Sequence, residues 1–174
     1  MGRWRSQTLQ GGSNHLIKII TTYRVCQTAQ SGLLTAYEQQ WHSLITQANT
    51  LHPNPRQSML LDFQSFIQSR VGQTHHILLM WDANSTLHDP DIQAFITDCQ
   101  LHNLQSGCKS TIPINTSARG HHIYFLLGTN LLQSTLHKSG ILNRHNIPLS
   151  DHRALFADLD EQALFQGTTM EKLC

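Results

Sequence analysis

The feature that most constrains the fold of this chain is a run of five apolar residues at positions 77–81, inside the stretch HHILLMWDANS. A short, unbroken apolar run bounded by polar residues is typical of a strand covered on both faces. Asp82 and Asn84 follow the run directly. We therefore expect a buried strand that brings two polar side chains to the edge of a sheet. Asp and Asn are also favoured in turns, so the pair alone does not define a site.

Other strands and helices are expected on both sides of this run. Turn residues at 11–14 precede a β-rich segment, which predicts a hairpin over residues 4–25. Asn54 and Asp89 each precede a proline and are expected to cap helices whose apolar residues recur at helical spacing. The helices are expected over residues 35–47, 54–71 and 89–101, and further strands over 121–129 and 153–160. Helices between buried strands indicate an α/β or layered α+β fold.

Composition limits the class of protein without naming it. With 174 residues the chain is long enough for one domain, and its net charge of +1 does not by itself indicate nucleic-acid binding. No stretch approaches the roughly 20 apolar residues of a membrane span, and the first ten residues do not resemble a secretory signal. The four cysteines are scattered, which is typical of free thiols in a reducing compartment. We expect a nuclear or cytoplasmic protein without a membrane partner.

Polar residues mark the ends of three expected strands. Asp82 and Asn84 follow one strand, Thr129 follows another, and Asp151 and His152 precede the last. If these ends converge, one carboxylate can hold Mg²⁺ and another can take a proton from water. An amide and an imidazole can donate hydrogen bonds to a phosphate oxygen as charge develops on it. The combination predicts metal-assisted phosphodiester hydrolysis.

Four segments together resemble the endonuclease/exonuclease/phosphatase family, which includes deoxyribonuclease-I-like and apurinic-endonuclease-like proteins. LLMWDAN resembles the family strand that ends in Gly-Asp-x-Asn, with Trp81 in place of Gly. PLSDHRALFADL resembles its closing Ser-Asp-His motif, and HHIYFLLGT resembles its Arg-Ile-Asp strand. IKIITTYRV resembles the strand that ends in a phosphate-contacting Tyr. The order and spacing agree over roughly residues 2–160, and the chain is especially similar to retroelement-type nuclease domains.

This resemblance implies a role for five residues of the chain. Asp82 would activate or orient water, and Asn84 would stabilise the transition state. Asp151 would contribute to a site for Mg²⁺ or Mn²⁺. His152 and Tyr23 would contact the scissile phosphate. The implied activity is that of a metal-dependent endonuclease acting on DNA.

The chain also departs from the family pattern. The principal metal ligand of the family is a Glu in the first half of its fold, and neither Glu38 nor Glu161 has the expected context. Tyr124 stands where the family has the Asp that orients the catalytic His. We therefore expect residues 1–160 to form the C-terminal portion of a four-layer α/β/β/α sandwich without its N-terminal part, followed by a tail over 161–174. We expect the chain by itself to be impaired or inactive as an enzyme. We also expect it to self-associate through an exposed sheet face.

Three alternatives remain open at this level. Arginines at several positions could line a phosphate-facing groove of a DNA-binding module that does not cleave: Arg3, Arg5, Arg24, Arg119, Arg144 and Arg153. The chain could instead be a decaying retroelement-derived reading frame. A zinc site could use Cys99, His102, Cys108, His121 and His122, although their spacing matches no closed site well and Cys99 is expected in a helix core.

Overall fold

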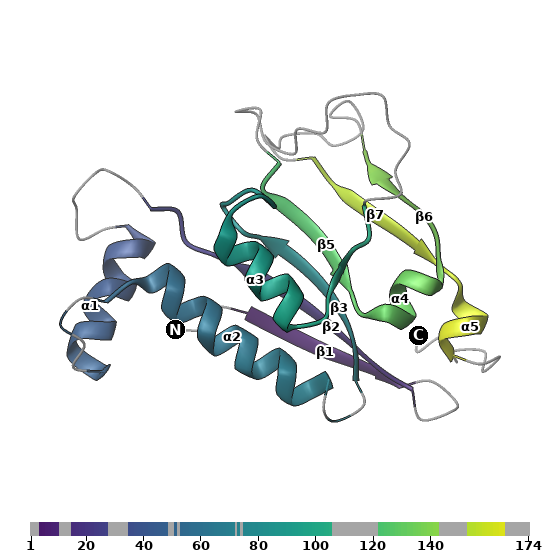
Figure 1. The fold of residues 1–174 in the computed structure, drawn as a ribbon, viewed down its shortest axis with the longest axis horizontal. Coiled ribbons are helices and arrows are strands. Elements are labelled where there is room, and N and C mark those ends of the chain that lie inside the picture. Colours follow the sequence, from purple (N-terminus) through teal and green to yellow (C-terminus); the bar gives the residue numbers. More distant parts are fainter. Residues whose placement is uncertain are drawn as a thin grey trace, which may run out of the picture.

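The structure is a computed structural model that describes residues 4–10, 15–27, 35–48, 51, 53–71, 73, 75–105, 122–142 and 153–165. Its centre is a five-stranded sheet in the order β1–β2–β3–β5–β4 (Figure 1). The strands are β1 (Trp4–Gln10), β2 (Leu16–Tyr23), β3 (His75–Asp82), β4 (His102–Asn103) and β5 (Tyr124–Gly128). β2 and β3 are parallel, and the other neighbouring pairs are antiparallel.

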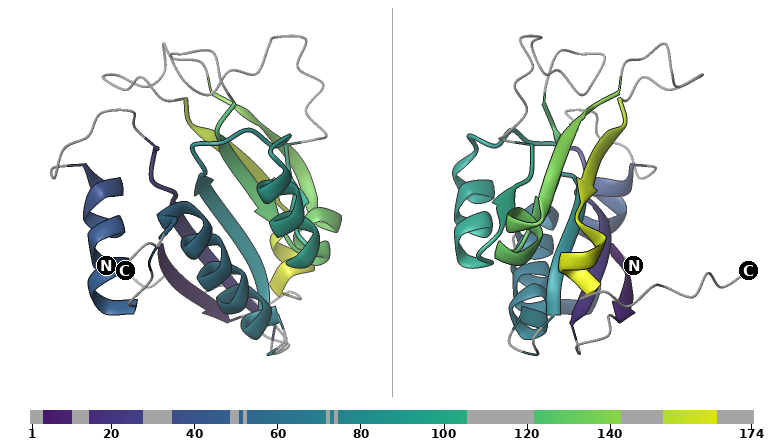
Figure 2. Two further views of the ribbon diagram at one scale, coloured as in Figure 1. Left: turned by 60° about the vertical axis from the view of Figure 1, so that its left-hand side comes forward. Right: turned by 90° about the vertical axis from the view of Figure 1, so that its right-hand side faces the viewer.

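A second, smaller sheet pairs β6 (Leu136–Ile141) with β7 (Leu155–Leu159) in antiparallel fashion. The helices are α1 (Ala36–Ala48), α2 (Pro55–Val71), α3 (Pro90–Asp98), α4 (Asn130–Ser134) and α5 (Glu161–Phe165). Helices α2 and α3 lie on one face of the five-stranded sheet, and the two small strands lie beyond β5 (Figures 1 and 2). This arrangement confirms the expected layered α+β class. None of the described helices combines the length and the apolar character that crossing a bilayer requires.

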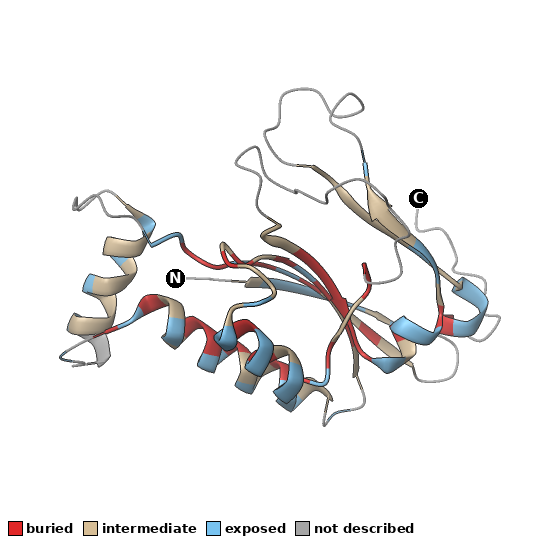
Figure 3. Cartoon of the chain, turned by 45° about the horizontal axis from the view of Figure 1, so that its top comes forward, coloured by how far each residue is buried: buried red, intermediate tan, exposed pale blue. Residues whose placement is uncertain are grey.

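The larger core lies between the sheet and helices α2 and α3, whose inner sides are buried (Figure 3). Apolar residues of α2 and α3 meet the alternate residues of β3 that point toward them. Trp81 is at the centre, with its ring centroid 5.0 Å from that of Phe95 and 6.3 Å from that of Phe63. Asn54 caps α2 as the sequence predicts, because its Oδ1 accepts hydrogen bonds from the backbone N–H groups of Arg56 and Gln57.

The opposite face of the sheet is covered over only part of its length. Ile17 of β2 packs there with Leu132 of α4 and with Leu164 and Phe165 of α5. Further along β3, Met80 on this face keeps 39 % of its surface exposed. The expectation of a strand buried on both faces is therefore wrong for this part of β3, because Met80 borders a cavity between β3, β5 and the start of β7.

The last expected element also differs from the structure. Residues expected to form a tail begin with α5, and Leu164 and Phe165 are buried. The two apolar side chains close the smaller core, so residues 161–165 contribute to the packed structure. Asp89 does precede α3, but its carboxylate binds the N–H and hydroxyl groups of Thr86 instead of capping the helix.

Candidate functional site

Three of the residues singled out in the sequence form a row across adjacent strands. Tyr23 of β2 pairs with Asp82 of β3, and Asp82 pairs with Tyr124 of β5. Residues opposite each other in neighbouring strands point to the same face of a sheet. This face is the half-covered one, opposite to Trp81, and Tyr23 is 47 % exposed on it. We call Tyr23, Asp82 and Tyr124 the polar row.

The backbone turns sharply directly after the polar row. Asn84 has a φ of 45°, in the left-handed region that Asn tolerates better than most residues. Its backbone N–H donates to Oδ1 of Asp82 over 3.3 Å, which closes an Asx turn. Ala83 N–H donates to Ile123 O, and Arg24 N–H donates to Asp82 O over 2.8 Å. The Asp82 carboxylate is therefore held within a turn that is tied to both neighbouring strands.

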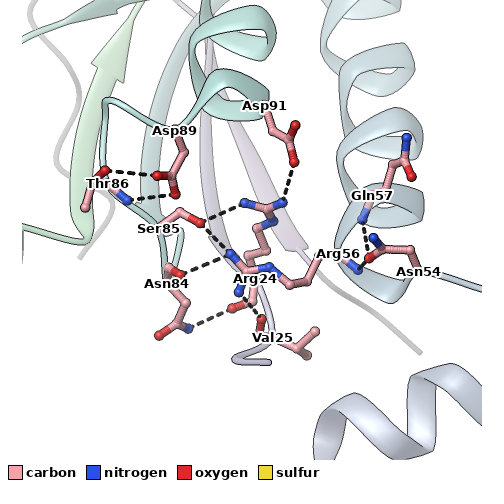
Figure 4. Close-up of polar contacts among 10 residues, drawn as sticks. All are labelled: Arg24, Val25, Asn54, Arg56, Gln57, Asn84, Ser85, Thr86, Asp89 and Asp91. Carbon is pink, nitrogen blue, oxygen red and sulfur yellow. Dashed lines mark hydrogen bonds and ion pairs between the residues drawn. The ribbon is translucent and has the colours of Figure 1, made fainter. Parts of the chain in front are cut away.

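The side-chain amide of Asn84 is also bound to the end of β2. Its Nδ2 donates to Arg24 O over 2.7 Å, as Figure 4 shows, and its Oδ1 accepts from the thiol of Cys26. An amide has two N–H donors. One donor of Asn84 thus fixes the turn, and the second has no acceptor among the described residues, so it can donate to a ligand such as a phosphate.

Two arginines contact this turn, and the sequence points to a role for only one of them. Arg24 is among the arginines that could line a phosphate-facing groove, but it is 2 % exposed, and burial is the main cause that lowers its pKa to about 10. The nearby charge of Arg56 lowers this pKa further, and Asp91 opposes the shift. Arg56 comes from the first turn of α2. One sequence signal could have shown that Arg24 is buried. Thr22 and Arg24 continue the alternation of β2 on the face that carries Ile20, which packs in the core beneath the helices.

A cavity of about 290 Å³ opens beside the polar row, between β3, β5 and the start of β7. It combines a carboxylate, a phenol and a guanidinium, and Nε of Arg153 is buried without an acceptor among the described residues. Apolar side chains form the remaining walls. The lining residues are Thr21, Met80, Trp81, Asp82, Tyr124, Phe125, Leu126, Arg153 and Leu155.

A second cavity of about 340 Å³ lies at the opposite end of β3. Its described lining includes His75 and His76 but no carboxylate. It also lies far along β3 from Asp82, at the other end of the same strand. The cavity at the polar row is therefore the better candidate for phosphodiester chemistry.

The described residues do not make a metal site by themselves. Among them there is no group of three or more His, Cys, Asp or Glu side chains that could hold a metal ion. Asp151 and His152, expected to bind metal and phosphate, lie outside the described residues. Glu38 lies in α1 and Glu161 is the first residue of α5, so neither belongs to the strands that carry the polar row. Asp82 alone does not meet the requirement of Mg²⁺ for several oxygen ligands.

The zinc alternative is not supported by the part of the chain that is described. Cys99 is buried in the core between α3 and the sheet, and this burial raises the pKa of its thiol to about 12. A thiol must lose its proton to bind zinc, which this environment opposes. Cys108 and His121 lie outside the described residues.

Comparison with solved structures identifies the class of fold. The chain is similar to the catalytic domain of Xenopus laevis APE2, with a TM-score of 0.62 at 11 % identity, over 91 % of this chain and 55 % of that one. It is similar to NExo (D146N) from Neisseria, described as a 3′ phosphatase bound to product DNA hairpin, with a TM-score of 0.60 at 14 % identity, over 91 % and 65 %. An AP endonuclease from Archaeoglobus fulgidus gives a TM-score of 0.57 at 12 % identity, over 90 % and 72 %.

These likenesses show that the chain has the endonuclease/exonuclease/phosphatase fold, which the four sequence segments predicted. The chain spans 55 % and 65 % of the first two structures, so it corresponds to a part of each. No family model matches the sequence, and no curated protein matches it either. At identities this low, the comparisons establish the fold and leave the chemistry to be argued from the residues.

Proposed function

We propose that the polar row and the turn behind it are the phosphodiester site of a nuclease-type hydrolase, that the ligand is DNA, and that hydrolysis at this site is strongly impaired. The observation that carries the proposal is the register that aligns Tyr23, Asp82 and Tyr124 on one face of the sheet. Asn84 follows at once and keeps an N–H donor for a phosphate oxygen. The structural neighbours described as DNA-processing proteins support the choice of DNA as the ligand.

Each side chain of the row has a role in this proposal. The Asp82 carboxylate accepts a hydrogen bond from the attacking water and orients it. The Tyr23 hydroxyl and Asn84 Nδ2 donate to phosphate oxygens on which charge develops. Arg153 in the adjoining cavity gives a further donor to an anionic ligand. Together these groups bind a phosphodiester, and this binding does not depend on how fast the site cleaves it.

The proposed impairment follows from Tyr124. By resemblance, a carboxylate stands in this position beside the catalytic Asp, whereas a phenol is neutral near pH 7 because its pKa is about 10. Catalytic groups that act as a unit lose most of their effect when one of them is changed. The Mg²⁺ or Mn²⁺ cofactor also rests on resemblance, since the described residues do not complete a site for it.

DNA binding without cleavage is a second candidate function, and Tyr124 beside Asp82 is the observation that favours it. Binding through phosphate contacts weakens as salt concentration rises, with a slope that reflects the number of phosphates neutralised. Fluorescence anisotropy of a labelled duplex in EDTA, at several salt concentrations, measures this property separately from hydrolysis.

The test of hydrolysis is nicking of supercoiled plasmid by purified protein, with Mg²⁺, with Mn²⁺ and with EDTA. We expect slow, metal-dependent nicking at most, lost in Asp82→Asn and kept in the matched control Asp158→Asn on the exposed side of β7. Tyr124→Asp is expected to raise the rate by about tenfold or more, because a second carboxylate is restored. Fast nicking by the unchanged protein would contradict the proposed impairment, and nicking that persists in Asp82→Asn would contradict the proposed site.

A further inference from the structure

Two guanidinium groups bind the turn after the polar row: that of Arg24, which follows β2, and that of Arg56 in α2. Arg56 Nη1 donates to Val25 O over 2.9 Å, and its Nη2 donates to Asn84 O over 3.1 Å and to the hydroxyl of Ser85. Arg24 Nη1 donates to the same hydroxyl over 3.0 Å. Figure 4 shows the guanidiniums of both side chains directed at the 84–85 segment. We call Arg24, Arg56 and Ser85 the arginine clamp.

The clamp acts on the turn that carries Asn84: Arg56 binds the Asn84 carbonyl directly, whereas the Arg24 guanidinium binds the neighbouring Ser85. Arg56 fixes the carbonyl of Asn84, and the backbone carbonyl of Arg24 accepts from the Asn84 side chain. The backbone N–H of Arg24 donates to Asp82 O. The end of β2, the turn after β3 and the start of α2 are thus linked around one left-handed residue. A change in either guanidinium is expected to alter where Asn84 and Asp82 point.

Charge compensation does not explain why two guanidiniums are placed here. Among the described residues, the carboxylate that forms an ion pair with the clamp is Asp91, whose Oδ2 lies 3.4 Å from Arg24 Nη2 and which is 66 % exposed. An ion pair with an exposed partner contributes little, and burying like charges together is unfavourable. The planar, multiply donating guanidinium is instead well suited to hold several carbonyl and hydroxyl oxygens in one arrangement. The two guanidinium charges, offset in part by Asp91 and Asp89, lie next to the turn of the site proposed to bind a phosphodiester.

We propose that Arg24 and Arg56 are positioning residues of the phosphodiester site: they hold Asn84 in its left-handed conformation, aim Asp82 across the polar row, and keep positive charge beneath the bound phosphate. This inference rests on the proposed function of the polar row. Neither guanidinium needs to contact the substrate, because both act through the turn. A displacement of about 1 Å at such a turn can change catalysis by about a hundredfold.

The test uses the full chain with Arg56→Lys and Arg24→Lys, and with Arg70→Lys as the matched control. Arg70 is on the same helix as Arg56, near its other end, and it binds Gln73 instead of the turn. The first measurement is the pair of side-chain amide signals of Asn84 in ¹⁵N nuclear magnetic resonance spectra. In the clamp variants we expect these signals to move and their exchange with water to rise by about tenfold, because Lys cannot make all the guanidinium hydrogen bonds to Asn84 O and Ser85 that hold the turn.

The second measurement is the affinity for a short labelled DNA duplex in EDTA. We expect the dissociation constant to rise by about tenfold in both clamp variants, since a charge-assisted arrangement beneath the phosphate is loosened, and to stay unchanged in Arg70→Lys. In Arg56→Ala, millimolar guanidinium is expected to restore the Asn84 signals, whereas the same concentration of sodium is not. A residue that only stabilised the fold would lower the melting temperature without this selective recovery.

The outcomes separate the two claims. Unchanged Asn84 signals in folded Arg56→Lys would overturn the inference, whatever the protein does with DNA. If the signals respond and guanidinium restores them, but the unchanged protein neither binds nor nicks DNA, the positioning is upheld and the proposed function fails. If Arg24→Lys does not fold, Arg56→Lys decides, since Arg56 is only half-buried.

Discussion

Replacement of Trp81 by Ala is expected to remove a large part of the stability of the fold. Trp81 is 2 % exposed and lies among three aromatic rings, with Phe95 at 5.0 Å and Phe63 and Phe125 at 6.3 Å between centroids. Burying about 200 Å² of an aromatic side chain contributes about 5 kcal/mol at roughly 25 cal/mol per Å². Aromatic-to-Ala changes in cores cost about 3–5 kcal/mol. For a chain of this size that lowers the melting temperature by roughly 6–20 °C.

Trp81→Phe is expected to cost much less than Trp81→Ala. The indole Nε1 is buried without an acceptor among the described residues, and a buried unpaired donor costs about 1–3 kcal/mol. Phe gives up part of the buried area but also removes this donor, so we expect a net loss of about 1 kcal/mol.

Urea unfolding followed by circular dichroism at the helix signal measures both variants without relying on tryptophan fluorescence. Trp41→Phe on α1 serves as the control, because Trp41 is half-buried at the edge of the molecule. Equal losses for Trp81→Phe and Trp81→Ala would refute the reasoning, as would a loss below about 1 kcal/mol for Trp81→Ala.

Two further predictions concern acid stability and the open face of the sheet. Burial, followed by the charges of His15 and His75, lowers the pKa of His76 below its ordinary value of 6.5. Its neutral form therefore favours the folded state, so this contribution is complete above pH 6.5 and is lost as the pH falls through that value toward the folded pKa. Urea midpoints at pH 7.5 and 5.5 should differ less in His76→Gln. The half-exposed face at Met80 is expected to cause self-association at high concentration, which sedimentation velocity should detect and Met80→Lys should reduce.

The elements that the sequence predicts well are those whose signals are local. The two strands of the hairpin over 4–25 pair as predicted, and the helix after Asn54 has both a cap and a proline at its start. The strand β6 gave no such signal, since LHKSGI is polar and contains Gly140. It pairs with β7, and a Cβ at Gly140 would lie 2.8 Å from the ring of Phe156. Tertiary packing, which a single sequence does not display, makes this segment a strand.

The sequence singles out several residues of the candidate site but not the arginines that support them. Tyr23, Asp82 and Asn84 stand out because polar residues at strand ends are visible in the sequence. The burial of Arg24 is not visible, because its side-chain partners, Ser85 and Asp91, come from the turn after β3 and from α3. An arginine in a chain of low net charge is ordinarily a surface residue, and only the three-dimensional path of the chain turns this one inward. Asp151 and His152 remain predictions from the sequence.

The register of β2, β3 and β5 also determines when this site can exist during folding. Tyr23, Asp82 and Tyr124 come from three distant parts of the chain, with two helices between the first pair. Contacts across such separations form only after long loops have closed, whereas the β1–β2 hairpin and the helices need only local contacts. The polar row is therefore absent from partly folded states. A ligand that binds there binds only the completed sheet, so it should slow global unfolding and leave local fraying of α1 unaffected.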